Sequence, residues 1–274
     1  MVRSTSVTRT EANRARQATW SRSLERGLAI LSTFGDSERA TLGVSELSRA
    51  LGLSRSTTHR YVATLTSLGY LRQDADSRRY RLGPRVLDLG FAALNSMGIR
   101  ELSVPHLQRL SDETGFTVNM AILDGVDVVY IERCRTSRSG QREIDLNLHV
   151  GSRLPAYCTA LGKALLAHLP KPALDELLGR MELVARGPNT ITRKAALRAE
   201  LARIRESGVA VNNEELAYGL RSVAAPVRDR SGEVTAALNL AVHRTMLSTE
   251  DLVERYAPSV QRTAAAISAE LGYR

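Results

Sequence analysis

A chain of 274 residues, 43% of them hydrophobic, is long enough to bury a core in one or two domains. The formal net charge is +9, and residues 1–81 carry +7 of it, with fourteen arginines, no lysine and seven acidic residues. This excess favours a polyanionic partner such as nucleic acid, because guanidinium groups bind phosphates and base edges in a bidentate way. The only cysteines, Cys134 and Cys158, indicate neither a disulfide framework nor a zinc site.

The chain shows no sign of membrane insertion or export. No stretch approaches the roughly 20 apolar residues of a membrane span, and the N-terminus lacks the apolar core of a signal peptide. We therefore expect a cytoplasmic protein with no membrane partner. Composition alone leaves a basic soluble enzyme open as an alternative.

The first domain is predicted over residues 20–82, after a disordered basic tail at residues 1–19 that lacks a hydrophobic period. Three helical patterns precede two short extended runs, and Ser54 is a good N-cap for the third helix. That helix is expected to bury a stripe formed by Tyr61, Leu65 and Leu68. The expected helices are Ser21 to Gly35, Val44 to Leu51 and Arg55 to Ser67, and the strands are Tyr70 to Gln73 and Arg78 to Leu82. This order is typical of a winged helix-turn-helix.

A linker helix is predicted over residues 83–100, with Val86, Leu87, Leu89 and Leu94 spaced for a buried stripe. Residues 101–274 alternate between strand and helix patterns, and Asp124-Gly125 is a strong hairpin signal. We expect an α+β domain with a mostly antiparallel sheet. Its strands are predicted at Phe116 to Leu123, Val126 to Glu132, Glu143 to His149, Val209 to Asn212, Ser222 to Arg228 and Thr235 to His243. Its helices are predicted at Leu102 to Thr114, Cys158 to His168, Ala173 to Arg180, Arg193 to Ser207 and Glu250 to Leu271.

The third helix of the first domain has a polar start that suits the reading of double-stranded DNA. The second helix of a helix-turn-helix pair presents its N-terminal residues to the major groove. Arginine can bind guanine or phosphate, and short hydroxyl side chains can donate to phosphates near the positive end of a helix dipole. The candidate DNA-binding residues are Ser54, Arg55, Ser56, Thr57, Thr58 and Arg60 on the helix, and Arg78, Arg79 and Arg81 on the wing.

Six groups of residues, three in each domain, resemble the IclR family of bacterial regulators across nearly the whole chain beyond the tail. In the first domain these are the run from Ser23 to Leu31, the Ala50 to Ser54 turn and Leu68-Gly69-Tyr70-Leu71. In the second they are Gly151 to Pro155, Cys158 to Ala164 and Gly219 to Pro226. The run Arg142 to Thr159 is most similar to the branch that controls aromatic-acid breakdown through the β-ketoadipate pathway, the PcaR, PcaU and PobR type.

The resemblance implies a GAF-like effector-binding domain and a protein that forms homodimers or tetramers. The implied effector is a small carboxylate or aromatic acid, such as protocatechuate, 4-hydroxybenzoate or a β-ketoadipate-type acid, and no cofactor or metal is expected. The alternative is a regulator of the same family that controls an operon for the use of a different carboxylate. Carried over position by position, the effector-binding residues would be Thr159, Ala160, Leu161, Asn212, Ser222, Asn239 and Ala241. Free N–H groups at the start of a helix suit a carboxylate, and neutral hydrogen bonders orient it.

The same residues argue against an enzyme. Gly162-Lys163 resembles part of a phosphate loop, but Tyr157 and Ala164 stand where that motif needs glycine and a hydroxyl residue. Gly162 is instead expected to let its helix pack closely. Cys158 at a helix start would have a lowered pKa, and His149 or His243 could serve as its base. A lone cysteine among apolar neighbours more often packs, so we expect a regulator and no enzyme.

Overall fold

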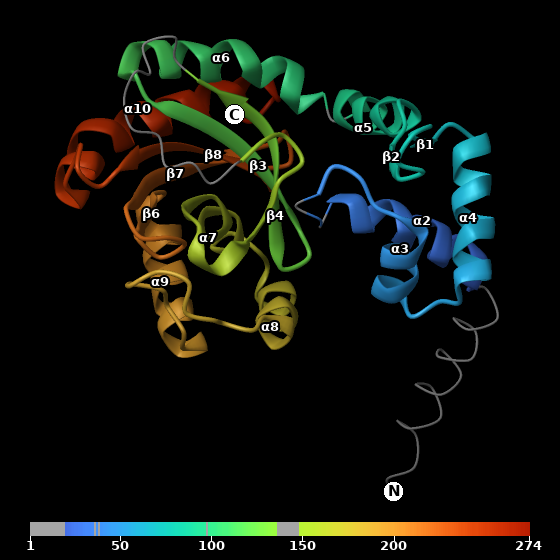
Figure 1. Cartoon of the computed structure of the whole chain (residues 1–274). Coiled ribbons are helices and arrows are strands. Elements are labelled where there is room, and N and C mark those ends of the chain that lie inside the picture. The colour runs from blue at the N-terminus through green and yellow to red at the C-terminus, as the bar shows by residue number, and fades with distance from the viewer. Residues whose placement is uncertain (1–19, 36, 38, 97, 136–147) are drawn as a thin grey trace, which may run out of the picture. The chain divides into compact units, whose positions relative to one another are not determined.

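The computed structural model describes residues 20–35, 37, 39–96, 98–135 and 148–274 (Figure 1). The chain divides into two compact units, residues 1–93 and 94–274. The boundary falls inside a helix, so the linker predicted over residues 83–100 is divided between the units. The tail predicted at residues 1–19 lies outside the described residues. No helix of the described residues is long and apolar enough to cross a membrane.

The first unit has the helix, helix, helix, hairpin order that the sequence predicts. Its elements are α2 (Arg22–Gly35), α3 (Val44–Leu51), α4 (Arg55–Ser67), β1 (Leu71–Gln73), β2 (Tyr80–Leu82) and α5 (Arg85–Ser96). Strands β1 and β2 pair antiparallel and form the wing. The chain can turn sharply between α3 and α4 because Gly52 adopts the left-handed region at φ 62°.

The small core of this unit confirms part of the predicted stripe of α4, since Tyr61 and Leu65 are partly buried against it, and corrects the rest. Ile30, Leu47 and Val62 are fully buried in it. The residues that α4 buries completely are Thr58 and Val62, one turn apart, whereas Leu68 is 50% exposed. Leu68 is exposed because it caps the end of the helix, where the chain leaves the packed face.

The second unit is built on one six-stranded antiparallel sheet, in the order β5-β4-β3-β8-β7-β6. Its strands are β3 (Thr117–Asp124), β4 (Asp127–Cys134), β5 (Arg153–Pro155), β6 (Ala210–Asn213), β7 (Leu220–Arg228) and β8 (Val234–His243). Its helices are α6 (Ile99–Thr114), η1 (Ala156–Cys158, a 3-10 turn), α7 (Ala160–Leu166), α8 (Lys171–Arg180), α9 (Lys194–Ser207) and α10 (Thr249–Glu270). The predicted α+β class is confirmed.

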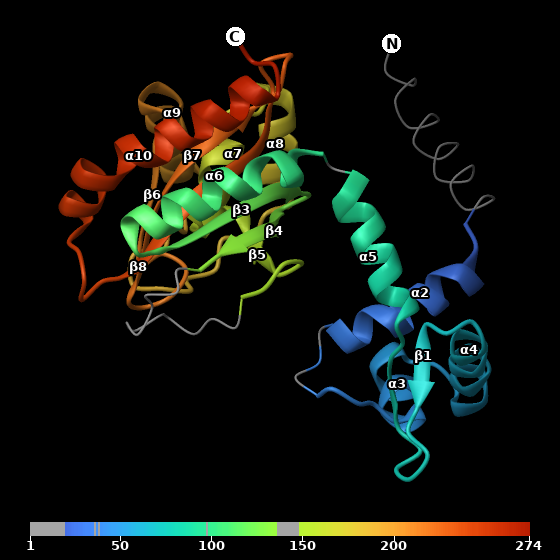
Figure 2. The ribbon, with the colours of Figure 1, turned by 90° about the horizontal axis from the view of Figure 1, so that it is seen from above.

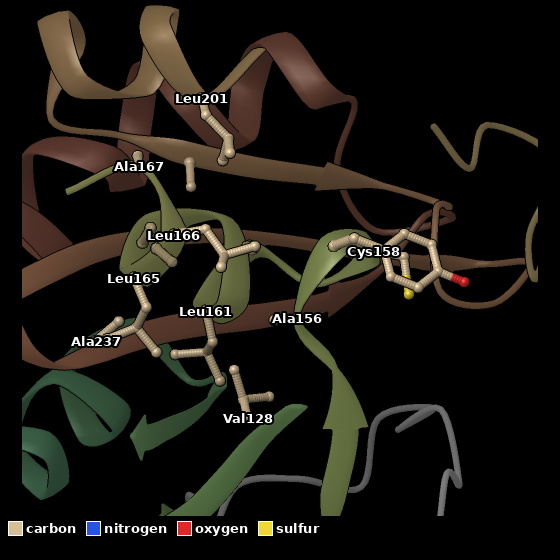
Figure 3. Close-up of a cluster of buried hydrophobic side chains, with 14 of the residues drawn as sticks. Val128, Ala156, Cys158, Leu161, Leu165, Leu166, Ala167, Leu201 and Ala237 are labelled. Carbon is tan, nitrogen blue, oxygen red and sulfur yellow. The ribbon is translucent and has the colours of Figure 1, made fainter. Parts of the chain in front are cut away.

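Helices cover both faces of this sheet, as the two views of Figures 1 and 2 show. Helices α6 and α10 pack on one face over a core that includes Met120 and Leu238. Helix α7 packs on the other face, with α9 behind it, over a core that includes Leu161 and Ala237. Figure 3 shows the leucines of α7 in this second core among the side chains of Val128, Ala237 and Leu201.

Two predicted elements of the second unit differ from the structure. The helix predicted from Cys158 to His168 begins later, because Cys158 ends η1 and the extended Thr159 separates it from α7. Most of the strand predicted from Glu143 to His149 lies outside the described residues, and the final two residues of that range have no regular secondary structure. The short strand β5 was not predicted.

Candidate functional site

The start of α4 is a compact hydroxyl cluster held by its own cap. Ser54 Oγ accepts the backbone N–H of Thr57 at 3.2 Å, and it lies 2.8 Å from Thr57 Oγ1 and 3.1 Å from Ser56 Oγ. Ser54, Arg55 and Ser56 are exposed. A cap of this kind satisfies one free N–H group and leaves the others at the helix start directed outward. The cluster therefore presents donors and a cation at the tip of the helix.

A groove of ≈ 470 Å³ lies between the start of α3, the exposed side of α4 and the wing. Arg55 lines it from the helix, and Arg78 and Arg79 line it from the wing, so three of the predicted DNA-binding cations meet in one concave surface. His59 follows Arg55 by one helical turn and also lines it. His59 and Gln73 were not predicted; the spacing of His59 from Arg55 is the signal that could have identified it. The lining residues are Gly43, Val44, Ser45, Glu46, Arg55, His59, Gln73, Ser77, Arg78, Arg79 and Tyr80.

Arg79 is bonded within the protein and connects the wing to α3. Its Nε donates to Thr41 Oγ1 at 3.0 Å, and its Nη2 donates to the Thr41 carbonyl at 2.9 Å and to Glu46 Oε2 at 2.7 Å. The same Glu46 oxygen accepts the N–H of Gly43 at 2.7 Å, which caps α3. That backbone bond and the guanidinium groups of Arg79 and Arg39 hold the pKa of Glu46 below its ordinary value. Arg79 thus holds the wing in place.

The other predicted DNA-binding residues differ in what they offer. Thr58 is fully buried and its hydroxyl donates to the Ser54 carbonyl at 3.0 Å, so no phosphate can reach it. This corrects the sequence prediction, and the physical reason is that Thr58 lies on the core side of α4.

Arg60 is exposed but lies five residues after Arg55, about 140° around the helix, and does not line the groove. Arg81 is exposed on β2, opposite Arg72.

Four of the predicted effector residues share one face of the sheet in the second unit. Alternation along the strands places them on the side of α7, because their neighbours at two-residue spacing, such as Ala224 and Ala237, belong to the core beneath that helix. The register aligns Asn212, Ser222 and Ala241 directly across three strands. Asn239 lies in the next row, beside Ala224. The sequence prediction therefore selected residues that the fold brings together.

Polar side chains in that face carry different hydrogen bonds. Ser222 is 2% exposed, and its hydroxyl has no hydrogen-bond partner among the described residues. Asn212 is bonded locally: its Nδ2 donates to the Cys158 carbonyl at 2.9 Å and its Oδ1 accepts the N–H of Glu215 at 3.1 Å. Asn239 Oδ1 accepts Nδ2 of Asn119 at 2.8 Å. Asn119 was not predicted, although an asparagine within an apolar strand pattern was a visible signal.

The start of α7 approaches the 3-10 turn very closely. Thr159 Oγ1 accepts the N–H of Gly162 at 3.0 Å, while the N–H groups of Ala160 and Leu161 lie in the first turn, where a helix offers them no acceptor. A Cβ on Gly162 would lie 2.1 Å from the carbonyl oxygen of Ala156. The predicted packing role of Gly162 is confirmed, since only glycine fits this approach.

Cys158 does not have the properties of a nucleophile. It is fully buried, and burial raises the pKa of its thiol to about 11, which corrects the lowered pKa expected from a helix start. A low-pKa thiolate needs an exposed, electropositive setting. The described residues also hold no group of three or more histidine, cysteine or acidic side chains that could bind a metal ion.

A buried ion pair involves Lys163, which follows Gly162 on α7. The ammonium of Lys163, 1% exposed, contacts Glu215 Oε1 and lies 3.6 Å from Glu200 Oε1. Burial raises the pKa of Glu215 against the opposing effect of Lys163. Lys163 lies on α7 and Glu215 in the turn after β6, so the ion pair connects these two elements. The backbone N–H of Glu215 is also bonded to Asn212.

Comparison with known proteins gives the family. Residues 23–75 match the IclR helix-turn-helix domain, and residues 91–269 match the C-terminal domain of the bacterial transcriptional regulator IclR. The chain is 40% identical over 236 residues to the Pca regulon regulatory protein of Pseudomonas putida, which covers 86% of this chain and 79% of that protein.

Two solved structures extend the similarity to the fold. A transcriptional regulator from Rhodococcus superposes with a TM-score of 0.79 at 38% identity, over 92% of this chain and 98% of that one. An IclR homologue from Microbacterium hydrocarbonoxydans, solved in complex with 4-hydroxybenzoate, superposes with a TM-score of 0.78 at 27% identity, over 91% of this chain and 98% of that one. The matched domains, which pair a helix-turn-helix with an effector-binding domain, show that the chain belongs to the IclR family of transcriptional regulators and is not an enzyme.

Proposed function

We propose that this protein binds operator DNA through the first unit and controls an operon for the breakdown of aromatic acids in response to a small aromatic carboxylate. The observation that carries the DNA-binding part is the groove in which Arg55 of α4 and Arg78 of the wing meet. Arg55 and Arg60 would contact base edges or phosphates from different sides of α4. The regulator would act in the cytoplasm, where bacterial DNA lies.

Within this proposal the wing contact belongs to Arg78. Arg78 is exposed and holds a positive φ of 55°, and its N–H donates to the Asp74 carbonyl at 3.1 Å. The backbone of the turn, and not the Arg78 side chain, sets the path of the following residues. The guanidinium can therefore contact a phosphate. Arg79 acts through the position of the wing, and Thr58 is left out of the interface.

A binding assay on the DNA upstream of the protein's own gene tests these roles. Arg55→Ala and Arg60→Ala are expected to weaken specific binding by roughly 1–3 kcal/mol each if they read bases. Arg78→Gly removes the cation at a backbone conformation that glycine accepts, and it should weaken binding to all sequences and lower the salt slope by about 1. Arg262→Ala, on α10 of the other unit, is the matched control. Unchanged affinity in the first three variants would contradict the interface.

The effector part of the proposal rests on the α7 face of the sheet. Ser222 offers a buried hydroxyl without a partner among the described residues, and Ala241 and Ala224 are small neighbours of it and of Asn239. Buried polar groups normally have a partner, so an unpaired hydroxyl in a face lined with small side chains indicates a ligand position. Ala160 and Leu161 would add first-turn N–H groups. Asn212 would position the turn before α7.

The choice of an aromatic acid is supported by two relatives. One is the Pca regulon regulatory protein, and the other is the homologue solved with 4-hydroxybenzoate. Calorimetric titration with protocatechuate, 4-hydroxybenzoate and aliphatic dicarboxylates tests the choice. A binder should also change operator affinity, because a ligand shifts an equilibrium only through its different affinity for the two states. Absence of binding at millimolar concentration, or unchanged affinity in Asn239→Leu, would refute the site.

We further propose that α5 mediates homodimer formation. Leu87, Leu89 and Phe91 are 62%, 57% and 57% exposed in the single chain. The buried stripe expected from the spacing is therefore not covered within the chain: Val86 and Leu94 are half-buried and the others face outward. Exposed apolar side chains gathered on one short helix favour a partner surface, and paired half-sites require a two-fold reader.

A further inference from the structure

A chain of three side chains crosses the sheet toward the proposed effector position. Arg133 of β4, Asn119 of β3 and Asn239 of β8 lie directly opposite one another in the register. Arg133 Nη1 donates to Asn119 Oδ1 at 3.0 Å, and Asn119 Nδ2 donates to Asn239 Oδ1 at 2.8 Å. Both asparagines are almost fully buried, at 2% and 5% exposure. The next residue in the row is Ala224 of β7, which has no polar side-chain group.

The guanidinium of Arg133 determines the orientation of both amides. A guanidinium has donors and no acceptor, so Asn119 must turn its oxygen toward Arg133. The Nδ2 of Asn119 then points to Asn239, and Asn239 in turn must use its oxygen to accept. This leaves the two N–H groups of Asn239 Nδ2 on the far side, where no hydrogen-bond partner occurs among the described residues. Without the cation, either orientation of the amide pair would satisfy the bond between them.

We propose that Arg133 and Asn119 are positioning residues that make Asn239 present hydrogen-bond donors to the effector, and so select a carboxylate over its uncharged carboxamide. This inference rests on the effector site proposed above and adds which hydrogen-bonding groups that site presents to the ligand. Chained hydrogen bonds polarise one another, so the guanidinium strengthens the donors of Asn239 two residues away. The site thereby favours an anion although the charge itself lies at the far end of the row.

A substitution that turns the Asn239 amide around is the direct test. In Asn119→Asp the carboxylate accepts from Arg133 on one side and can only accept from Asn239 on the other. The Asn239 amide must then turn, and its oxygen faces the effector. Affinities for 4-hydroxybenzoate and 4-hydroxybenzamide, measured by calorimetry on the full chain, report the orientation. We expect the benzoate to lose about tenfold or more in affinity, while the benzamide, whose NH₂ can donate to the turned oxygen, binds as well or more tightly.

Three further variants separate polarity from charge and from damage to the fold. Arg133→Lys keeps a donor-only head and should preserve the preference for the benzoate. Arg133→Met releases the orientation, so the ratio of the two affinities should shrink. Ala265→Asp adds the same negative charge at an exposed position of α10 in the same unit and should leave the ratio unchanged. An unchanged ratio in Asn119→Asp, including an equal loss of both ligands, overturns the proposal.

A measurement without ligand keeps this inference separate from the proposed effector. Selective ¹⁵N labelling of asparagine gives the exchange rates of the side-chain amide protons with water. In the wild-type chain the Asn239 protons should exchange faster than those of Asn119, and in Asn119→Asp the Asn239 protons should slow because one then donates to a carboxylate. If Asn239 is instead the protected amide in the wild-type chain, the orientation is wrong. If neither ligand binds while the exchange rates behave as expected, the proposed effector is wrong, but Arg133 and Asn119 still determine the orientation of the Asn239 amide.

Discussion

Replacement of Gly162 by alanine should destabilise the second unit, although alanine is the better helix former. The added Cβ would lie 2.1 Å from the Ala156 carbonyl oxygen and 2.3 Å from its Cα. These are backbone atoms of the 3-10 turn, so the helix and the turn must separate. Overpacking costs typically about 1–3 kcal/mol, and we take the upper end because no flexible side chain can yield. The gain in helix propensity offsets about 1 kcal/mol, which leaves a net loss of about 2 kcal/mol.

The matched control is Gly179→Ala in α8, where nothing lies within 4 Å of the added Cβ. This variant should be neutral or slightly stabilising, so the same substitution should have opposite effects at the two helices. For a unit of this size, 2 kcal/mol lowers the melting temperature by roughly 4–8 °C in differential scanning calorimetry. Effector affinity should also fall, because Thr159 and Ala160 move with the turn. A melting temperature of Gly162→Ala equal to that of Gly179→Ala would refute the close-packing argument.

Three other outcomes follow from the described contacts. Arg79→Ala should lower both operator affinity and the stability of the first unit by about 1–2 kcal/mol, whereas Arg78→Gly should lower affinity alone, as measured by DNA titration and thermal melting. Phe91→Asp should raise the dimer dissociation constant about tenfold or more in ultracentrifugation, with Val184→Asp, also exposed, as the control. Burial, with Arg228 and Arg205, lowers the pKa of His168 to about 4; the unfolded chain then binds the proton first, so stability should fall from pH 6.5 toward 4, and His168→Gln should flatten this fall.

Helices α3 and α4 of the first unit could be predicted to the residue because their boundaries are set by local chemistry. Ser54 caps α4 and Gly52 provides the left-handed turn before it. Those signals act within four or five residues and do not depend on the rest of the fold. The side that α4 buries was predicted less well: Thr58 faces the core, and only its packing against the other helices determines that.

The second unit shows what sequence patterns miss. Strand β5 has three residues and exists through its pairing with β4, so no periodicity can reveal it. Asn119 and Arg133 are fourteen residues apart in the chain, and a strand register brings them together. The bulge between Met120 and Ala121 in the pairing of β3 with β4 sets this register, and turn residues alone do not predict it.

The bonding of the polar residues on the α7 face distinguishes positions that resemblance alone treats as equal. Asn212 uses its oxygen and one N–H group in hydrogen bonds within the protein, whereas the Ser222 hydroxyl bonds to none of the described residues. In Asn239 the oxygen accepts a hydrogen bond and both N–H groups of the side chain are left without one among those residues. A donor whose orientation is set before the ligand arrives loses little freedom on binding, which is the benefit of a preorganised site. Because that orientation derives from a guanidinium outside the site, one substitution at Asn119 should invert ligand preference while the residues that touch the ligand stay the same.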